Sequence, residues 1–397
     1  MIPSVRSAFN THFSTANYQQ LLAFLEERHP GALEFRVAEA PVFVPRRLTE
    51  RLIEAGEHIV DALLHPDFSS RSTAAIPPHL YVPGHEGKSE MLCLDFAICR
   101  DRSGDLIPQL IELQGFPTLL FFQAALARAY RHCYDIPAGF DNYFNGYNHQ
   151  RYNQLLNRLL LGRQAPEHVV LLEVLPHEQK TKLDFYLTED ATGIKTVCVS
   201  ELFREGKAYY YYRDGQQTAI KRIYNRLIAE DLEQQKKRLP RFVDITVPTD
   251  VTWVPHPNWF YRISKHTLPS LSSPYVPETS FLDQNNLPED LEQYVLKPLY
   301  SFAGHGVLVD VRETDIAAIN NPSQWILQRK VEYAPVVNTP TGAAVCEIRM
   351  IYCWEPGAQR PVLVNNLVRL SKSKLMGVRY NAGMDWVGVG IGFFEQG

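Results

Sequence analysis

The segment YVLKPLYSFAGHGVLVDV, residues 294–311, is the most informative stretch of the chain. An apolar, strand-like run carries one lysine, Lys297, and leads into a turn of small residues, Gly304-His305-Gly306. Lys297 alone is compatible with a lysine that reaches solvent at a strand end. Glycines, however, let backbone N–H groups approach an anion closely, and lysine neutralises phosphate as a point charge. Together the two features favour a phosphate site, whereas a tight hairpin is the alternative for the turn alone.

The composition bounds the class of protein. The 397 residues suffice for two or three lobes, and 45% hydrophobic with 21% charged residues is typical of a globular protein. The net charge is −4 and no long basic run exists, so we expect no nucleic-acid partner. The most apolar segment, residues 116–130, is short and is interrupted by Gln123 and Arg128, so we expect no membrane span.

The cysteines and the first residues of the chain indicate the cellular compartment of the protein. The six cysteines form no Cys-x-x-Cys pair, which argues against a disulfide framework or a zinc site. The opening MIPSVRSAFNTHF lacks the apolar core of a signal peptide. Both observations predict a cytoplasmic protein with reduced thiols.

Hydrophobic periodicity predicts four segments. The first is helical, the second holds two strands joined at RSGD and then a buried helix, and the third is a small strand–helix–strand unit. The third segment continues with a hairpin at Asp214-Gly215 and a basic helix over IKRIYNRL, and the fourth ends in alternating runs that predict an antiparallel sheet. The segments are residues 1–84, 85–165, 166–245 and 246–397.

Three oxygen-bearing side chains form a candidate metal site. Asp95 lies in LCLDFAI, and Glu112 and Gln114 lie in LIELQGFP. Residues i and i+2 of a strand share a face, so Glu112 and Gln114 project together and the hairpin can bring Asp95 beside them. Two carboxylates and a carbonyl oxygen suit Mg²⁺ completed by phosphates and water. The alternative is a set of solvent-facing residues on a half-exposed hairpin.

Two arginines and one polar strand end are further candidates. Glu347 and Arg349 share a strand face, and Arg369 could join them to clamp a phosphate or carboxylate. A cross-strand salt bridge is the alternative. WILQRKVEY, residues 325–333, is an apolar strand that turns polar, either as a sheet edge or as a hinge that offers backbone groups to adenine. Lys265 in RISKHTLPSL is uninformative by itself.

Taken in order, these pieces resemble the circularly permuted ATP-grasp proteins, including the glutathionylspermidine-synthase-like group. The resemblance covers roughly residues 85–397. The matching segments are DFAICRDRSGDLIPQLIELQGFPT for magnesium, HVVLLEVLP with IKRIYNRL for the unit before the ATP site, RISKHTLPSLSS and YVLKPLYSFAGHGV for two lysines and the phosphate loop, WILQRKV for the adenine hinge, and EIRMIYCW for the acid-x-Arg strand.

The resemblance implies an α/β (α+β) fold of permuted ATP-grasp architecture, with a helical N-terminal segment and a small α/β unit before the ATP site. It implies ATP and Mg²⁺ as cofactors. It assigns nucleotide phosphates to Lys265, Lys297 and the loop Gly304, His305 and Gly306, adenine to the backbone near Gln328, Arg329 and Val331, Mg²⁺ to Asp95, Glu112 and Gln114, and the substrate carboxylate or acylphosphate to Arg349 and Arg369.

The implied activity is a MgATP-dependent carboxylate–amine ligase that works through an acylphosphate, with an amino acid or peptide as carboxylate and amine substrates. Three positions depart from the family pattern: Gln114 replaces an asparagine, Cys93 replaces an arginine, and Glu347-x-Arg349 replaces Asp-x-Arg. Cys93 and Gln114 motivate a nucleotide-binding protein without ligase activity as the alternative. A scaffold whose lysine and glycine turn are only structural is a third hypothesis.

Overall fold

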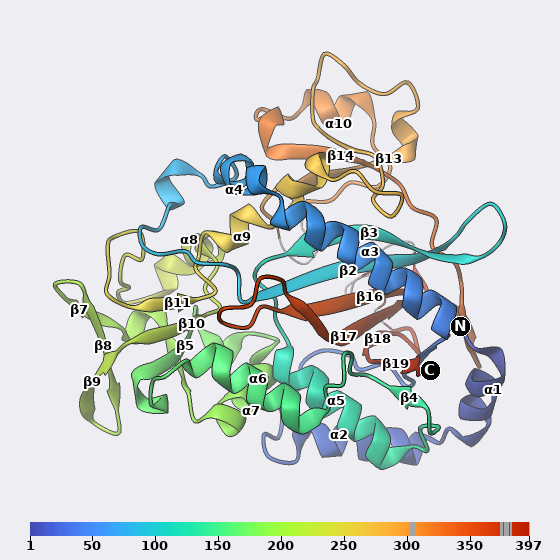
Figure 1. The fold of residues 1–397 in the computed structure, drawn as a ribbon, viewed down its shortest axis with the longest axis horizontal. Coiled ribbons are helices and arrows are strands. Elements are labelled where there is room, and N and C mark those ends of the chain that lie inside the picture. The colour runs from blue at the N-terminus through green and yellow to red at the C-terminus, as the bar shows by residue number, and fades with distance from the viewer. Residues whose placement is uncertain (302–305, 374–375, 377–380, 382, 397) are drawn as a thin grey trace.

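A computed structural model describes residues 1–301, 306–373, 376, 381 and 383–396. The fold is mixed α/β and contains several sheets (Figure 1). Its central sheet has the order β18-β17-β16-β2-β3, and β15 pairs with β16. The strands of this sheet are β2 (Met91–Arg100), β3 (Leu106–Gln114), β15 (Val337–Thr339), β16 (Gly342–Cys353), β17 (Val362–Ser371) and β18 (Gly388–Gly390).

The antiparallel β2–β3 pair confirms the predicted hairpin. Strand β2 is buried on both faces, so it reads as an almost continuous apolar run. On one face Leu94 and Phe96 pack with α3 (Arg46–Leu64), and on the other Cys93 packs with α5 (Leu120–Cys133). Helix α5 confirms the predicted buried helix.

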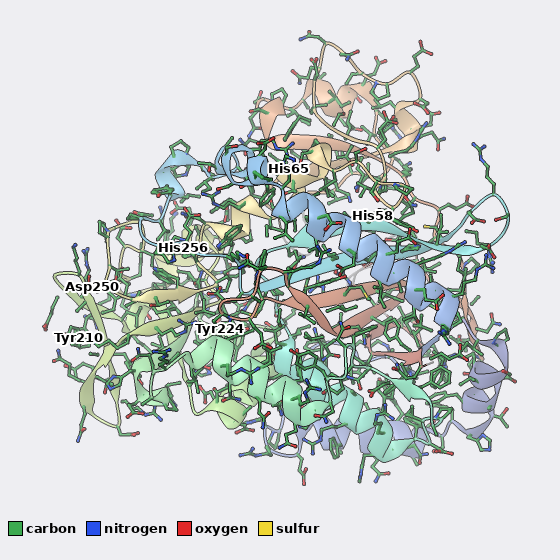
Figure 2. The ribbon with its side chains drawn as sticks, in the orientation of Figure 1. His58, His65, Tyr210, Tyr224, Asp250 and His256 are labelled. Carbon is green, nitrogen blue, oxygen red and sulfur yellow. The ribbon has the colours of Figure 1, made fainter. Side chains whose placement is uncertain are left out.

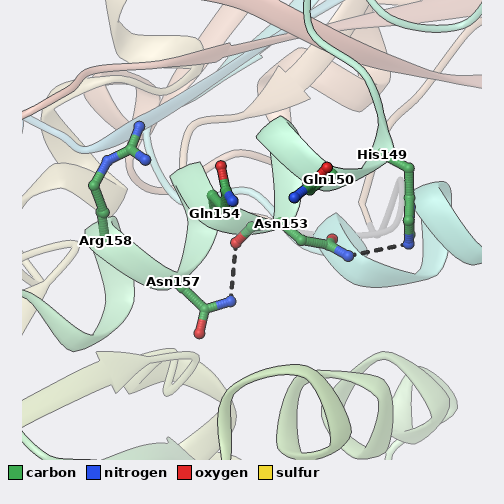
Figure 3. Close-up of a pocket in the computed structure, with 6 residues that line it drawn as sticks. All are labelled: His149, Gln150, Asn153, Gln154, Asn157 and Arg158. Atoms are coloured by element: carbon green, nitrogen blue, oxygen red, sulfur yellow. Dashed lines mark hydrogen bonds between the residues drawn. The ribbon is translucent and has the colours of Figure 1, made fainter.

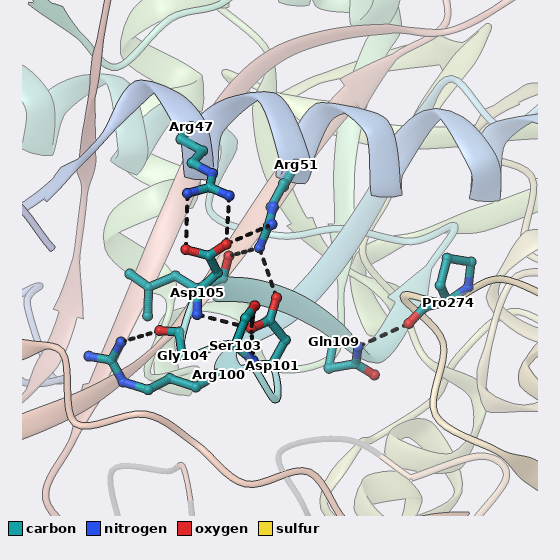
Figure 4. A network of polar contacts seen from close by, with 10 residues as sticks. Arg47, Arg51, Arg100, Asp101, Ser103, Gly104, Asp105, Gln109 and Pro274 are labelled. Carbon is teal, nitrogen blue, oxygen red and sulfur yellow. Dashed lines mark hydrogen bonds and ion pairs between the residues drawn. The ribbon is translucent and has the colours of Figure 1, made fainter.

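The tip of this hairpin is tied to α3 by exposed ion pairs. Arg47 donates to both oxygens of Asp105, at 3.0 and 2.6 Å, and Arg51 lies 3.4 Å from Asp105 (Figure 4). Asp101 closes the turn by accepting from the backbone N–H groups of Ser103 and Asp105. Because exposed pairs contribute little, the apolar face of α3 supplies most of the attachment.

The N-terminal segment is largely helical, as predicted, and it also provides a strand. Strand β1 pairs in parallel with β19 near the C-terminal end, and β19 pairs with β4. The elements of this layer are α1 (Pro3–His12), α2 (Thr15–Glu26), β1 (Val42–Val44), β4 (Phe140–Asp141) and β19 (Gly392–Glu395). Helix α4 (Pro66–Thr73) also belongs to the N-terminal segment but lies next to α3 and α9 (Trp259–Arg262).

A second unit contains a parallel sheet in the order β11-β10-β5-β6, which confirms the predicted α/β unit. Tyr224 on β10 is fully buried within it, and Tyr210 and Asp250 lie toward its outer end (Figure 2). Its elements are α6 (His149–Leu161), β5 (Val169–Glu173), α7 (Lys182–Thr192), β6 (Lys195–Cys198), β7 (Phe203–Glu205), β8 (Ala208–Arg213), β9 (Gln216–Ile220), β10 (Arg222–Asn225), α8 (Ala229–Gln235) and β11 (Thr252–Val254).

The basic helix predicted over IKRIYNRL is wrong, because this segment contains β10. Ile223 and Tyr224 are both buried, since neighbouring layers cover both faces of a parallel strand. Arg222 is not a solvated helix residue; it donates to the backbone oxygens of Leu159 and Leu160 at the end of α6.

The last segment forms more than the one antiparallel sheet that was predicted. β14 lies between β12 and β13 in a separate three-stranded sheet, which packs with α10 apart from the central sheet (Figure 1). These elements are α9 (Trp259–Arg262), β12 (Thr279–Phe281), β13 (Tyr294–Pro298), α10 (Glu313–Ala317) and β14 (Trp325–Arg329). Among the described residues, helices are too short or too polar to cross a bilayer.

Candidate functional site

A cavity of about 230 Å³ lies where the β12-β14-β13 sheet approaches β3, β16 and β17 of the central sheet. Residues from six separate parts of the chain line it. Of the residues predicted from sequence, it brings together Glu112, Lys265, Lys297, Arg369 and the end of β14 at Gln328, Arg329 and Val331.

Lys297 is held on β13 opposite Ile326 of β14. Its ammonium donates to Gln328 Oε1 at 2.5 Å and to the backbone oxygen of Ile111 at 3.2 Å. Burial lowers the pKa of Lys297 to about 8. The buried ammonium is therefore hydrogen-bonded and remains largely protonated at neutral pH.

Lys265 reaches the same cavity from a short 3₁₀ helix, residues 265–270. Its ammonium donates to the backbone oxygen of Ser301 at 2.8 Å and lies 3.3 Å from Glu112 Oε1. Burial would raise the pKa of Glu112, but the charges of Lys265, Lys297 and Arg369 together outweigh burial, and the pKa lies below the ordinary value. Glu112 and Lys265, which are far apart in the sequence, therefore lie side by side in the wall of the cavity.

Asp95 is enclosed by the two predicted arginines. Arg349 faces Asp95 across β2 and β16 and makes a bidentate pair, Nε to Oδ1 at 2.6 Å and Nη2 to Oδ2 at 2.7 Å. Arg369 on β17 donates to Oδ2 at 2.6 Å. Burial would raise the pKa of Asp95, but Arg349 and Arg369 hold it below the ordinary value.

Arg369 links this pair to Glu347. Its Nη2 lies 2.9 Å from Glu347 Oε2, and the hydroxyl of Tyr333 donates to the other oxygen of Glu347. Glu347 and Asp95 are each less than 5% exposed. Both residues therefore form the cross-strand salt bridges of the alternative interpretation: Glu347 pairs with Arg369, opposite it on β17, and Arg349 pairs with Asp95, opposite it on β2.

The predicted metal ligands do not fit Mg²⁺ as a set in this arrangement. Mg²⁺ requires near-octahedral oxygen ligands, whereas both oxygens of Asp95 accept guanidinium N–H groups and Glu112 faces Lys265. Gln114 pairs opposite Cys93 and does not line the cavity. Within the described part of the chain, no group of three His, Cys, Asp or Glu side chains could hold a metal ion.

The predicted phosphate loop is only partly described. Gly304 and His305 lie outside the described residues. Gly306 has φ +76°, where glycine is favoured, and a Cβ there would lie 3.1 Å from Pro298 Cγ. Gly306 does not itself line the cavity.

Several residues that line the cavity were not predicted from the sequence. Val295, Val307 and Val309 form an apolar wall, and Tyr333 supplies a hydroxyl. The i, i+2 spacing of Val307 and Val309 just after Gly306 was a signal for a shared face. Tyr333 ends the predicted hinge segment, but its partner Glu347 could not be inferred from spacing.

Comparison with known proteins gives a likeness at the level of fold. No family model matches, and no curated protein matches by sequence. One similar solved structure is the apo form of a glutathione synthetase-like effector (GSS30) from Globodera pallida, with a TM-score of 0.58 and 10% sequence identity. The match covers 96% of this chain and 97% of that one.

The chain has a glutathione synthetase-like fold. The likeness extends over nearly the whole of both chains. At this identity the comparison concerns the fold and leaves the chemistry to the side chains described above.

A hollow on the outer surface of α6 is a weaker candidate. Two hydrogen bonds join residues that line it: Asn153 donates to the His149 ring at 3.1 Å, and Asn157 donates to the backbone oxygen of Asn153 at 2.9 Å (Figure 3). This hollow gathers no charged pair like that of Lys265 and Lys297. The glutathione synthetase-like fold therefore has its best-equipped site at the β13–β14 cavity.

Proposed function

We propose that this protein is an ATP-dependent ligase that joins a carboxylate to an amine in the β13–β14 cavity. The single observation that carries the proposal is the convergence of Lys265 and Lys297, from separate elements, in one cavity beside Glu112. The permuted order of an ATP-grasp fold is part of the proposal and explains why the early acid precedes the late lysines.

The cavity wall supports binding of an adenine nucleotide. Lys265 and Lys297 supply two buried ammonium groups for the phosphates, and Val295, Val307 and Val309 supply apolar surface against which a base can pack. The end of β14 and the two residues after it, Gln328 to Val331, border the same space and offer backbone groups to the base edge.

The chemistry proposed is transfer of the terminal phosphoryl group to a substrate carboxylate, followed by attack of an amine on the acylphosphate. Such a transfer requires positioning and charge neutralisation rather than a nucleophilic side chain. Arg369 lines the cavity and is the candidate for holding the terminal phosphoryl group as it passes from the nucleotide to the substrate carboxylate. Arg349 stands behind it and orients Asp95, which in turn holds Arg369.

The first prediction tests the nucleotide site. Lys297→Met should weaken ATP binding at least tenfold, because it removes a buried cation from the phosphate region. The matched control is Lys195→Met, which alters an exposed lysine on β6. Fluorescent-nucleotide titration measures both dissociation constants, and equal affinity of the two variants would refute the assignment.

A second candidate is a nucleotide-binding protein without ligase activity. It is favoured by Cys93, whose place in the resembled family holds an arginine, and by the closed pairing of Asp95. A screen of amino acids and short peptides separates the candidates: a ligase releases ADP only when a carboxylate and an amine are both present. Failure of ATP to raise the melting temperature would instead favour the scaffold.

A further inference from the structure

Asp95 is occupied by arginine side chains, and this limits the ways in which the cavity can neutralise phosphate charge. Asp95 is 1% exposed and accepts three N–H groups from Arg349 and Arg369. Removing one partner of a buried ion pair is strongly destabilising, because it leaves a buried charge without compensation. A divalent cation at Asp95 would have to share the carboxylate with two guanidinium groups or displace one of them.

The neighbouring acids are also paired with cations. Glu347 accepts from Arg369 and from the Tyr333 hydroxyl, and Glu112 accepts from Lys265. A metal ion in this network would also lie beside two guanidinium groups and repel them. The acids therefore orient cations in this protein, rather than forming an open ligand set.

The cations of the cavity already outnumber the acids. Among the described residues that line it, five are cationic and two are acidic; the cationic ones are Lys265, Lys297, Arg329, Lys330 and Arg369. Arg329 and Lys330 pair on their outer side with Asp290 and Asp310, at 2.9 and 3.4 Å. In addition, the buried Nε of Arg369 has no hydrogen-bond partner among the described residues.

We propose that this cavity binds the phosphate groups of a nucleotide without a divalent metal ion, with Lys265, Lys297 and Arg369 supplying the neutralising charge. The proposal rests on the proposed nucleotide site, and it departs from the magnesium that the family resemblance implies. It holds for the ligase and for the plain nucleotide-binding protein, because it concerns the binding step.

The experiment measures ATP binding to the full chain by calorimetry in excess MgCl₂ and in excess EDTA. We expect dissociation constants that agree within about threefold, since the protein itself supplies the compensating charge. A loss of tenfold or more in EDTA would overturn the proposal and leave the nucleotide site intact. Absence of binding under both conditions would refute the nucleotide site and the metal-free mode with it.

A pair of variants gives a second measurement. Arg369→Gln should weaken ATP binding at least fivefold and by the same factor in MgCl₂ and in EDTA. The control is Arg360→Gln, an arginine that pairs with Glu57 and Asp61 on α3 and should leave affinity unchanged. A loss seen in MgCl₂ alone would mean that Arg369 acts through a bound metal, which contradicts the proposal. Circular dichroism checks that each variant is folded.

Discussion

At the scale of single residues, the charge state of Lys297 sets the pH range in which the cavity can hold an anion. The pKa of this lysine is about 8, whereas that of a free lysine is 10.5, because burial disfavours the ammonium. Between these values the unfolded chain binds more protons than the folded one. The contribution of Lys297 to the free energy of unfolding therefore rises with pH across this window.

The same titration predicts pH-dependent nucleotide binding. ATP affinity should fall as pH rises above about 8, because neutral Lys297 no longer attracts phosphate. Lys297→Arg keeps its charge throughout and should remove the dependence. Titrations with a fluorescent nucleotide between pH 7 and 10 measure this, and an equal decline in both proteins would exclude Lys297 as its source.

At the scale of elements, α5 depends on a cap that comes from another helix. Leu119, which precedes α5, has φ +66° and gives no side-chain cap. Asp184 on α7 takes its place and accepts the backbone N–H groups of Leu119, Phe121 and Phe122, at 3.1, 2.9 and 2.8 Å. The carboxylate also lies at the positive end of the helix dipole.

Removal of this cap should destabilise the protein. Asp184→Ala leaves buried N–H groups without partners and should lower the free energy of unfolding by about 1–3 kcal/mol. Urea unfolding followed by circular dichroism measures the change. Asp190→Ala on the exposed side of α7 is the control and should lower the free energy of unfolding by less than about 1 kcal/mol. An equal decrease in the two variants would show that the Asp184 cap does not stabilise the protein more than an exposed ion pair does.

The elements also show where sequence reasoning succeeds. The hairpin of β2 and β3 was predicted because two apolar runs flank a strong turn. Lys297 was selected because a charge in an apolar strand requires a partner or solvent. The prediction of a basic helix was wrong because its arginines are not solvated. Arg222 donates to the backbone oxygens of Leu159 and Leu160, and Arg226 donates to that of Pro117. Sequence periodicity cannot reveal such distant partners.

At the scale of the whole molecule, the candidate site combines residues that are hundreds of positions apart. Motif order was enough to group Glu112 with Lys265 and Lys297. The pairing of Asp95 with Arg349 and Arg369 could not be predicted, because it depends on the register of β2, β16 and β17 in the folded sheet. The spacing of these residues in the sequence was compatible both with a clamp for a phosphate or carboxylate and with a cross-strand salt bridge.

The last strand should be essential to the stability of the whole. Phe394 on β19 is fully buried and packs edge-on against Phe144, with ring centroids 4.6 Å apart. Phe394→Ala should lower the free energy of unfolding by about 3–5 kcal/mol. Phe281→Ala is the control, because Phe281 is 42% exposed. Urea unfolding compares them, and similar midpoints would argue that β19 is dispensable.

The parallel pairing of β1 with β19 has a consequence for synthesis. Val42 and Gly392 are partners, 392 − 42 = 350 positions apart. At usual translation rates, roughly 20 to 70 seconds separate their emergence from the ribosome. During that interval the apolar β1 segment has an open edge, which gives a chaperone a defined window in which to shield it from other nascent chains.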